Sequence, residues 1–253
     1  MKLEGRAAIV TGGGRGIGQG IALALAGAGA DVAINYRRDE AAAKETVGQI
    51  QAMGRRSLAF HTDVTDYPLV EEMCNRTIDV LGKVDILVCN AGVASRGHYL
   101  ADTDVSEMHR LLNIHLFGAL HFARALIPHM RSHERADVHL ISSAATLGNQ
   151  AGHVPYATAK ACLETLGRCM AKEERRYGTR VNVIAPGLVE TELGRRLVRA
   201  TVGVENIKEL YPQYPFGRIC QPSDIGNLCV FLASEEGEYI SGHVIYLDGG
   251  ESL

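Results

Sequence analysis

Near its start the chain reads Arg6-Ala-Ala-Ile-Val-Thr-Gly-Gly-Gly-Arg-Gly-Ile-Gly18, a short apolar run that leads directly into a glycine-rich turn. Glycines allow a tight turn and let the backbone approach a pyrophosphate group, which is stabilised at the positive N-terminus of the following helix. The spacing of Gly12, Gly16 and Gly18 differs from the common Gly-x-Gly-x-x-Gly pattern. The stretch predicts a strand, a dinucleotide-binding turn and a helix, while a tight turn without a ligand stays open as the alternative.

Short apolar runs alternate with helix-length amphipathic segments along the rest of the chain. Most of the apolar runs are nearly continuous in Val, Ile, Leu and Ala, as expected of strands that are buried on both faces. This alternation predicts an α/β fold with a doubly wound parallel sheet and helices on both faces, and residues 1–253 are expected to form one domain. The expected strands cover 6–11, 31–36, 57–61, 84–89, 137–142, 180–185 and 243–247, and the expected helices lie near 17–28, 39–53, 67–82, 106–132, 155–177 and 222–234.

The main irregular region lies at about 188–220, where Pro212 and Pro215 interrupt any long helix. A loop of this length in a compact domain is usually either a functional lid or disordered. Because it follows Pro186-Gly187, we expect residues around 188–216 to form a lid over a substrate site.

Composition narrows the class of protein. With 46% hydrophobic and 22% charged residues, the chain has the make-up of an ordinary soluble globular protein, and its net charge of −3 gives no reason to expect binding to nucleic acid or to an anionic membrane surface. No signal peptide precedes the first strand, and we see no apolar stretch that approaches the roughly 18 residues needed to span a bilayer. The six cysteines form no Cys-x-x-Cys pair, which favours reduced thiols in a cytoplasmic protein.

Tyr156 and Lys160 are the strongest candidates for chemistry. Their i, i+4 spacing puts a phenol and an ammonium on one face of a helix. A free tyrosine has a pKa of about 10, and a cation about 4 Å away supplies up to roughly 4 kcal/mol toward ionising it near neutral pH. On its own, such a pair usually consists of two exposed side chains on a helix surface. Together with the glycine-rich turn, it indicates a catalytic acid/base whose pKa is shifted toward neutral pH.

The end of the second strand is where a dinucleotide presents its adenosine ribose. An Asp or Glu there favours NAD, whereas Arg favours NADP. This strand ends Ile34-Asn35-Tyr36-Arg37-Arg38, without an acidic residue before Asp39, and Arg15 in the glycine turn can approach the same 2′-phosphate. NADP is therefore the expected cofactor, with NAD as the alternative. The other interpretation is that Arg37 and Arg38 are solvent-exposed charges in a loop without a role in binding.

Two further turns complete the expected cofactor site. Asp63-Val64 follows the third strand and is placed to meet the adenine, and Asn90-Ala91-Gly92 follows the fourth and offers small residues beside the cofactor. Taken separately, each of these sequences more often forms an ordinary turn than a binding site. The candidate cofactor contacts up to this point are Thr11, Gly12, Arg15, Gly16, Ile17, Gly18, Tyr36, Arg37, Asp63, Val64, Asn90, Ala91 and Gly92.

Together these motifs resemble the short-chain dehydrogenase/reductase family, in its short single-domain form, over essentially the whole chain. The resemblance implies a Rossmann-type sheet of about seven strands, NAD(P) as cofactor, and assembly as a homotetramer or homodimer through the helices near 106–132 and 155–177. The residues that carry it are Thr11-Gly-x-x-x-Gly-Ile-Gly18, Asp63-Val64, Asn90-Ala-Gly92, Ser143, Tyr156-x-x-x-Lys160, Pro186-Gly187 with Thr191, and Asp248-Gly-Gly250.

The resemblance also implies a role for each catalytic candidate. Tyr156 is expected to give a proton to the carbonyl oxygen, or to remove it during alcohol oxidation. Lys160 is expected to bond the nicotinamide ribose and to lower the pKa of Tyr156. Ser143 is expected to hold and polarise the substrate oxygen, while its neighbour Ser142 points the other way. The family's nicotinamide lies beside the segment that here contains Pro186, Gly187, Val189 and Thr191, and Tyr156 and Lys160 also contact the cofactor.

One position departs from the family. An asparagine usually stands 28 residues before the serine and three before a glycine, and here that position is His115. Asn113 lies two residues earlier, roughly 200° around the helix, and should not substitute. We expect His115 to take over the largely positional role of the asparagine and to titrate near pH 6.5, which would disturb the site on the acid side. Cys89 replaces a second common asparagine, which is a lesser change.

These residues lead to competing functional hypotheses. The first is an NADP-dependent carbonyl reductase, with 3-oxoacyl thioesters as the best single substrate class because Gly217-Arg-Ile and Asp248-Gly-Gly250 resemble 3-oxoacyl-ACP reductases. The alternative enzyme is a dehydrogenase of a sugar, cyclic alcohol or steroid. From a different class, the chain could be a dinucleotide-sensing regulatory protein with vestigial chemistry; His115 favours this, whereas intact Ser143, Tyr156 and Lys160 oppose it.

Overall fold

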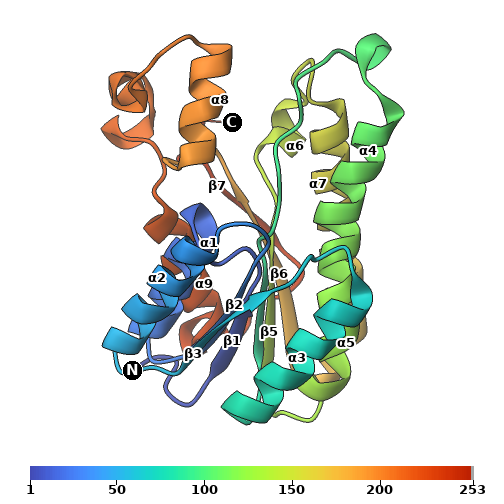
Figure 1. Cartoon of the computed structure of the whole chain (residues 1–253), viewed down its shortest axis with the longest axis vertical. Helices are drawn as coiled ribbons and strands as arrows, with labels where there is room; N and C mark the ends of the chain where they lie inside the picture. Colours follow the sequence, from blue (N-terminus) through green and yellow to red (C-terminus); the bar gives the residue numbers. More distant parts are fainter. Residues whose placement is uncertain (252–253) are drawn as a thin grey trace.

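Seven parallel strands form one sheet in the computed structural model, which describes residues 1–251 (Figure 1). The strand order is β3-β2-β1-β4-β5-β6-β7, so the predicted doubly wound sheet is confirmed. Each expected strand is present, and no end is shifted by more than two residues. The strands are β1 (Ala7–Val10), β2 (Asp31–Tyr36), β3 (Ser57–His61), β4 (Ile86–Cys89), β5 (Ala136–Ile141), β6 (Thr179–Pro186) and β7 (Val244–Leu247).

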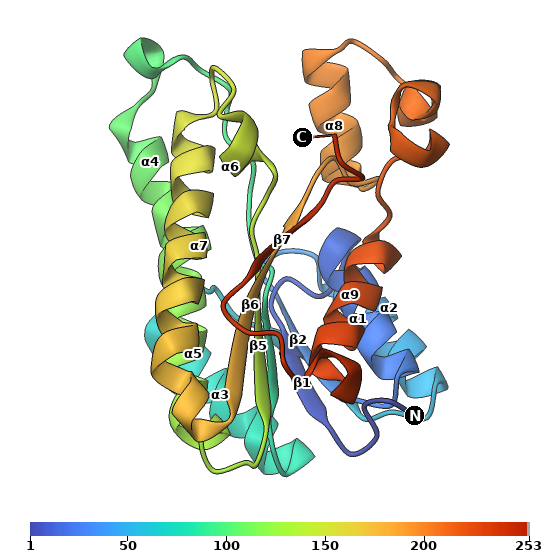
Figure 2. The same ribbon diagram turned by 180° about the vertical axis from the view of Figure 1, so that it is seen from behind.

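Helices cover both faces of the sheet (Figure 1, Figure 2). One core cluster contains Phe122 of α5 and Leu163 of α7, and the cluster on the opposite face contains Ile21 of α1 and Leu232 of α9. All four side chains are 1% exposed or less, so both faces of the sheet are covered. The helices are α1 (Gly16–Gly27), α2 (Glu40–Ala52), α3 (Tyr67–Leu81), α4 (Val105–Leu112), α5 (Gly118–Met130), α6 (Ala145–Gly148), α7 (Val154–Glu174), α8 (Glu192–Thr201) and α9 (Pro222–Ala233).

The strand order reverses at β1, which lies between β2 and β4. In sheets of this kind, ligands bind outside the carboxyl ends of the strands at such a reversal. Thr11 follows β1, Asn90 follows β4, and Ser143 comes two residues after β5, so the candidate residues from distant parts of the chain meet at this edge. We refer to it as the carboxyl edge.

The helix through Val105–Met130 corrects one expectation. It runs from α4 through a π-helical turn (Asn113–Phe117) into α5, and by length and composition alone it could cross a membrane. The statement that no apolar stretch approaches that length was therefore wrong. In the fold, 44% of its most apolar window is buried, and α5 packs on the sheet beside α3, which accounts for its apolar character.

The expected irregular region at 188–220 is also more ordered than predicted. It contains α8 and a 3₁₀ segment (Ile207–Gln213), and Val198, Ile207 and Leu210 are buried in a small cluster of their own with Ile219. We call residues 188–216 the lid segment. Figure 1 shows α8 above the carboxyl edge, opposite α6.

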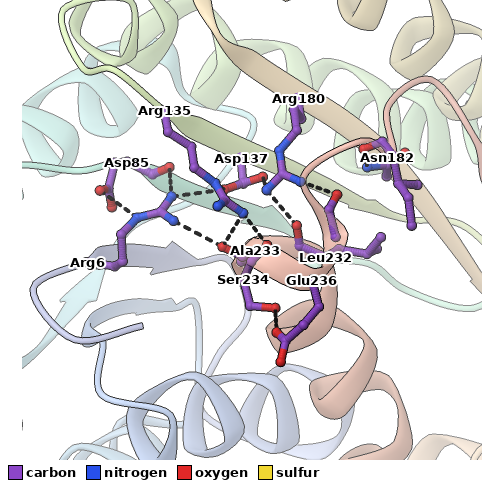
Figure 3. Close-up of polar contacts among 12 residues, drawn as sticks. Arg6, Asp85, Arg135, Asp137, Arg180, Asn182, Leu232, Ala233, Ser234 and Glu236 are labelled. Atoms are coloured by element: carbon purple, nitrogen blue, oxygen red, sulfur yellow. Dashed lines mark hydrogen bonds and ion pairs between the residues drawn. The ribbon is translucent and has the colours of Figure 1, made fainter. Parts of the chain in front are cut away.

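A buried ionic cluster lies at the amino ends of the strands, away from the candidate site (Figure 3). Asp137 is fully buried and pairs with Arg180 at 2.5 Å, Arg6 at 2.9 Å and Arg135 at 3.5 Å, while Arg6 also pairs with Asp85 at 2.7 Å. The arginines also donate to carbonyl oxygens at the C-terminal end of α9, for example from Arg135 Nη2 at 2.8 Å. Because that helix end is negative, it balances the excess of positive charge.

Candidate active site

Ser143 stands in the segment that connects β5 to α6 at the carboxyl edge. The backbone on either side of it is fixed by the neighbouring strand, since Ser142 N donates to Ile184 O at 2.7 Å and Ala144 N donates to Pro186 O at 2.8 Å. Ser143 Oγ accepts a hydrogen bond from Ala145 N at 3.2 Å and keeps its own hydrogen for another acceptor. Ser142 Oγ turns away from the site and donates to buried Glu164, as predicted.

Tyr156 and Lys160 lie one turn apart near the start of α7, as their spacing predicted. Lys160 is buried, its Nζ donates to Ile141 O at 2.7 Å and lies 5.7 Å from the centre of the Tyr156 ring. Burial lowers the pKa of Lys160 to about 7, although the carboxylate of Glu164 acts in the opposite direction. Lys160 is thus anchored to the end of β5, with its ammonium close to the phenol.

The expectation that the pKa of Tyr156 is lowered was wrong. Burial raises the pKa of Tyr156, and the hydrogen bond to the hydroxyl of Ser143 only partly offsets this. The phenol therefore carries its proton at neutral pH. Such a group is ready to act as a proton donor, and the contact with Ser143 places that proton beside the group expected to hold the substrate oxygen.

His115 lies in the π-helical turn and faces the catalytic residues. Its ring is 3% exposed and meets the Tyr156 ring edge to face, with centroids 5.4 Å apart and an interplanar angle of 89°. Nε2 lies 2.9 Å from Val93 O. A Cβ on Gly92 would stand 2.5 Å from His115 Cε1, so only glycine fits there. His115 thus buttresses both Tyr156 and the Gly92–Val93 backbone, whereas Asn113 is exposed and does not substitute, as predicted.

The predicted titration of His115 near pH 6.5 is not supported. Burial, together with the positive charge of Lys160, lowers the pKa of His115 to about 3. The imidazole is neutral throughout the physiological range. Cys89 packs nearby in the core, with Sγ 3.9 Å from Ala119 O, and burial raises the pKa of its thiol, so it is an inert core residue.

The glycine turn fits the pyrophosphate of a dinucleotide. Gly12 and Gly16 have φ of +64° and +57°, and a Cβ on Gly18 would stand 2.2 Å from Gly12 O. No side chain caps the start of α1 and its first turn holds no acidic residue, so its N–H groups are available to an anion. Ile17, in the first turn, packs with its side chain against the core under β1.

Thr11 joins the turn to the end of β4. Its Oγ1 accepts from Asn90 N at 2.8 Å and from Ala91 N at 2.9 Å, and its carbonyl accepts from Asn90 Nδ2 at 2.8 Å. Asn35 of β2 joins the glycine turn to the end of β3. Its Oδ1 accepts from Gly12 N at 2.8 Å, and its Nδ2 donates to Thr62 O at 2.8 Å. Sequence reasoning gave Asn35 no role, although a polar residue inside an apolar strand was a signal.

Tyr36, Arg37 and Asp63, which were predicted to meet the adenosine of the cofactor, lie together at the ends of β2 and β3. Arg37 Nε pairs with Asp63 Oδ2 at 2.8 Å, so its guanidinium is oriented but already shares its charge with a carboxylate. Val64 is buried, and its side chain lies against Gly118 at the start of α5. Arg15 is 67% exposed and lies 3.8 Å from Glu192 of α8, which leaves it able to move.

The segment expected to flank the nicotinamide follows β6. Pro186 ends the strand, a Cβ on Gly187 would stand 3.0 Å from Asp248 Cβ, and Val189 pairs with Cys220 through a backbone bridge. Thr191 caps α8 by accepting from Gly194 N at 3.0 Å. Its Cγ2 is 3.5 Å from where a Cβ on Gly16 would be, so the two predicted halves of the cofactor site are in contact.

This chain is similar in sequence and in fold to known oxidoreductases. A sequence profile described as enoyl-(acyl carrier protein) reductase matches residues 12–252. Trihydroxynaphthalene reductase PfmaI of Pestalotiopsis fici is 34% identical, with 98% of this chain and 89% of that protein covered. BbsD of Thauera aromatica, a subunit of (2S)-[(R)-hydroxy(phenyl)methyl]succinyl-CoA dehydrogenase, is 35% identical, covering 100% of this chain and 99% of that protein. A short-chain dehydrogenase from Burkholderia cenocepacia J2315, solved in complex with NADP, superimposes with a TM-score of 0.90 at 30% identity over both whole chains.

The chain belongs to the short-chain dehydrogenase/reductase family. It is accordingly an oxidoreductase of the class that interconverts carbonyls and alcohols with NAD(P). The resemblance to 3-oxoacyl-ACP reductases in particular is only approximate, because the relatives include reductases of other substrates.

Proposed function

We propose that the protein reduces a ketone to a secondary alcohol with NADPH. The single observation that carries this proposal is the contact of the Tyr156 phenol, which is protonated at neutral pH, with the Ser143 hydroxyl expected to hold the substrate oxygen. A protonated phenol is a donor, and carbonyl reduction needs a donor at the oxygen.

The side chains divide the work as follows. Ser143 holds and polarises the carbonyl oxygen, and Tyr156 gives it a proton. Lys160, anchored on Ile141 O, holds positive charge beside the phenol when it is protonated and so stabilises the phenolate that remains. His115 keeps the tyrosine ring in place. When bound, the nicotinamide cofactor supplies the hydride that reaches the carbonyl carbon.

NADP is the proposed cofactor. The end of β2 offers Arg37 and the glycine turn offers Arg15, and both guanidinium groups are more than half exposed, as a 2′-phosphate site requires. The related Burkholderia enzyme was solved with NADP, which supports this assignment.

A substrate with an apolar carbon skeleton fits the surroundings of the site. The segment that leads into α4, together with α6 and α8, stands above the carboxyl edge (Figure 1). These segments expose apolar side chains that a sugar would not need. The exposed residues are Tyr99, Leu100, Leu147, Leu193 and Leu197. We therefore favour a 3-oxoacyl thioester, with an aromatic or polycyclic ketone as the second candidate because the PfmaI relative is named for a naphthalene substrate.

The test is an NADPH-oxidation assay with a panel of carbonyls. It contains a 3-oxoacyl thioester of N-acetylcysteamine, 2-tetralone as a bicyclic aromatic ketone, a steroid ketone and a keto sugar. We expect the thioester or the tetralone to be reduced with kcat/KM at least about 100-fold above the sugar, which corresponds to roughly 3 kcal/mol of apolar contact. Reduction of the sugar alone would contradict the proposed substrate class. Binding of NADPH without reduction of any carbonyl would instead favour a sensing role.

We also propose that the protein is cytoplasmic and assembles as a homodimer or homotetramer through α5 and α7. Exposed Phe117 and Leu120 on the central helix support an interface there, as does the apolar hollow of about 540 Å³ along α7, lined by Ala157 and Ala161 among others. Light scattering of the purified protein gives the mass directly, and a monomer at micromolar concentration would rule this assembly out.

A further inference from the structure

Glu164 is a buried carboxylate on α7 whose hydrogen bonds go to the segment that carries Ser143. It is 5% exposed. Its Oε1 accepts from Ser142 Oγ at 2.9 Å and from Thr146 Oγ1 at 2.7 Å. One donor comes directly before Ser143 in the chain and the other three residues after it. A single carboxylate oxygen thus holds both sides of the segment against the helix that carries Tyr156.

The hydroxyl of Thr146 has two acceptors within reach. Its single hydrogen can go to Glu164 at 2.7 Å or to Ser143 O at 2.9 Å, and the charged oxygen is the stronger acceptor. Tyr246 of β7 lies 3.4 Å from the same hydroxyl and can donate to it. The chain of polar contacts therefore links α7, the Ser143 segment and the edge strand.

The second oxygen of Glu164 has a weaker partner. Arg168 Nη2 is 3.6 Å from Oε2 and the arginine is half exposed, so this contact contributes little. Lys160 stands one turn earlier on the same helix face, and its backbone carbonyl is 3.4 Å from Ser142 Oγ. Burying a carboxylate is costly unless it is hydrogen-bonded, and here most of the compensation comes from the two hydroxyls.

We infer that Glu164 is a positioning residue for Ser143, and that it sets the distance between the Ser143 hydroxyl and Tyr156 by fastening residues 142 and 146 to α7. This inference rests on the proposed carbonyl reduction. A role in packing alone would lower stability without acting through Ser143, so the two roles can be separated.

The test is a double-mutant cycle between Glu164→Ala and Ser143→Ala, measured as kcat/KM for the best carbonyl of the panel. Glu164→Gln is the conservative variant, because its amide oxygen can still accept both hydroxyl bonds. Glu173→Ala is the matched control, since it removes an exposed glutamate from the same helix. NADPH affinity is measured for every variant.

We expect Glu164→Ala to lower kcat/KM by about 10- to 100-fold in the wild-type background, the scale of a misplaced catalytic group. In the Ser143→Ala background the same change should cost less than about twofold, because the group it positions is already gone. Glu164→Gln should keep at least about a third of the activity, and all variants should bind NADPH like the wild type. Equal losses in both backgrounds, or a Gln variant as impaired as Ala, would overturn the inference.

A second readout does not depend on turnover. Amide hydrogen exchange over residues 143–148 should be at least about tenfold faster in Glu164→Ala than in wild type and unchanged in Glu164→Gln and Glu173→Ala. Unchanged exchange in the Ala variant would overturn the inference even if activity fell. Because this measurement needs no substrate, failure of the proposed activity and failure of the positioning role are distinguishable.

Discussion

Of three titratable side chains in the candidate active site, His115 and Lys160 are buried and Tyr156 is partly buried, and burial shifts the pKa of each one differently. It raises the pKa of Tyr156, lowers that of Lys160 to about 7 and lowers that of His115 to about 3. At neutral pH the phenol is therefore protonated, the imidazole is neutral and the amine is near its midpoint. Burial disfavours the charged form of every group, and at Lys160 the nearby carboxylate of Glu164 offsets only a part of this effect.

The neutral state of His115 leads to a prediction about pH. Its pKa of about 3 in the fold means that no proton is taken up there between pH 5 and pH 9. The kcat/KM profile of His115→Asn should therefore have the same shape as that of the wild type over this range, with values lower by a few fold because the edge-to-face contact with Tyr156 is lost. An acid limb that shifts by half a pH unit or more between the two proteins would contradict this.

Arg15 and Arg37 lead to a prediction about cofactor choice. We expect NADPH to bind roughly 10- to 100-fold more tightly than NADH, because charge-assisted contacts contribute about 1.5–3 kcal/mol. Arg37→Ala should reduce this preference by about tenfold without weakening NADH, while Arg76→Ala, at an exposed site on α3, should leave it unchanged. Titration at moderate salt measures these affinities, and an equal affinity of the wild type for both cofactors would refute the assignment.

The sequence was sufficient to predict some of these residues but not their charge states. Tyr156 and Lys160 follow from their spacing of one helix turn, whereas Ser143 was assigned from the family resemblance. The role of Glu164 could not be predicted, since it depends on hydroxyls more than 15 residues away that only the fold brings to it. The lowered pKa of Lys160 depends in the same way on how deeply the helix is buried.

At the scale of elements, α8 shows where the sequence pattern was misjudged. Thr191 caps the helix through Gly194, and Glu192 stands in its first turn, which are both helix-start signals. The irregular region was predicted mainly from Pro212 and Pro215. Both prolines lie after the end of α8, so they do not interrupt that helix. The short helix α6 was also missed, whereas the predicted helices with apolar faces that repeat over three turns or more, such as α3 and α7, are present.

The lid segment leads to a prediction about motion. Its small core around Ile207 is separate from the two large clusters that hold the sheet, so residues 188–216 should open as a unit. We expect their amides to exchange faster than those of β4 and β5 in the free protein and to slow at least about tenfold with NADP and substrate bound. Protection of α8 equal to that of the central strands without ligand would show that there is no lid.

At the scale of the whole molecule, we expect a histidine buried in the middle of β5 to limit the stability of the fold in acid. His139 is fully buried on β5, and neither of its ring nitrogens has a hydrogen-bond partner among the described residues. Burial lowers its pKa to about 4, against the raising effect of Asp137. The folded pKa lies below the unfolded value of about 6.5, so protons favour the unfolded chain. Stability from this group is complete above pH 6.5 and is lost as the pH falls toward 4.

We therefore expect His139→Val to reduce the acid sensitivity of the fold. Between pH 7.5 and pH 5 the wild type should lose up to about 2 kcal/mol more unfolding free energy than the variant, at 1.36 kcal/mol per pKa unit. Urea unfolding at the two pH values measures the difference, and His98→Ala, at an exposed position, is the control. The same loss in wild type and His139→Val would show that this histidine does not titrate on unfolding.

The measurement that tests the central claim most directly is the turnover of Tyr156→Phe with NADPH and the carbonyl that the wild type reduces best. The substitution removes only the hydroxyl, so the ring contact with His115 and the fold should remain. We expect NADPH affinity within about twofold of wild type and kcat lower by at least about 100-fold, the contribution of a positioned proton donor. A kcat near that of the wild type would contradict the assignment of Tyr156 as the proton donor and with it the proposed mechanism.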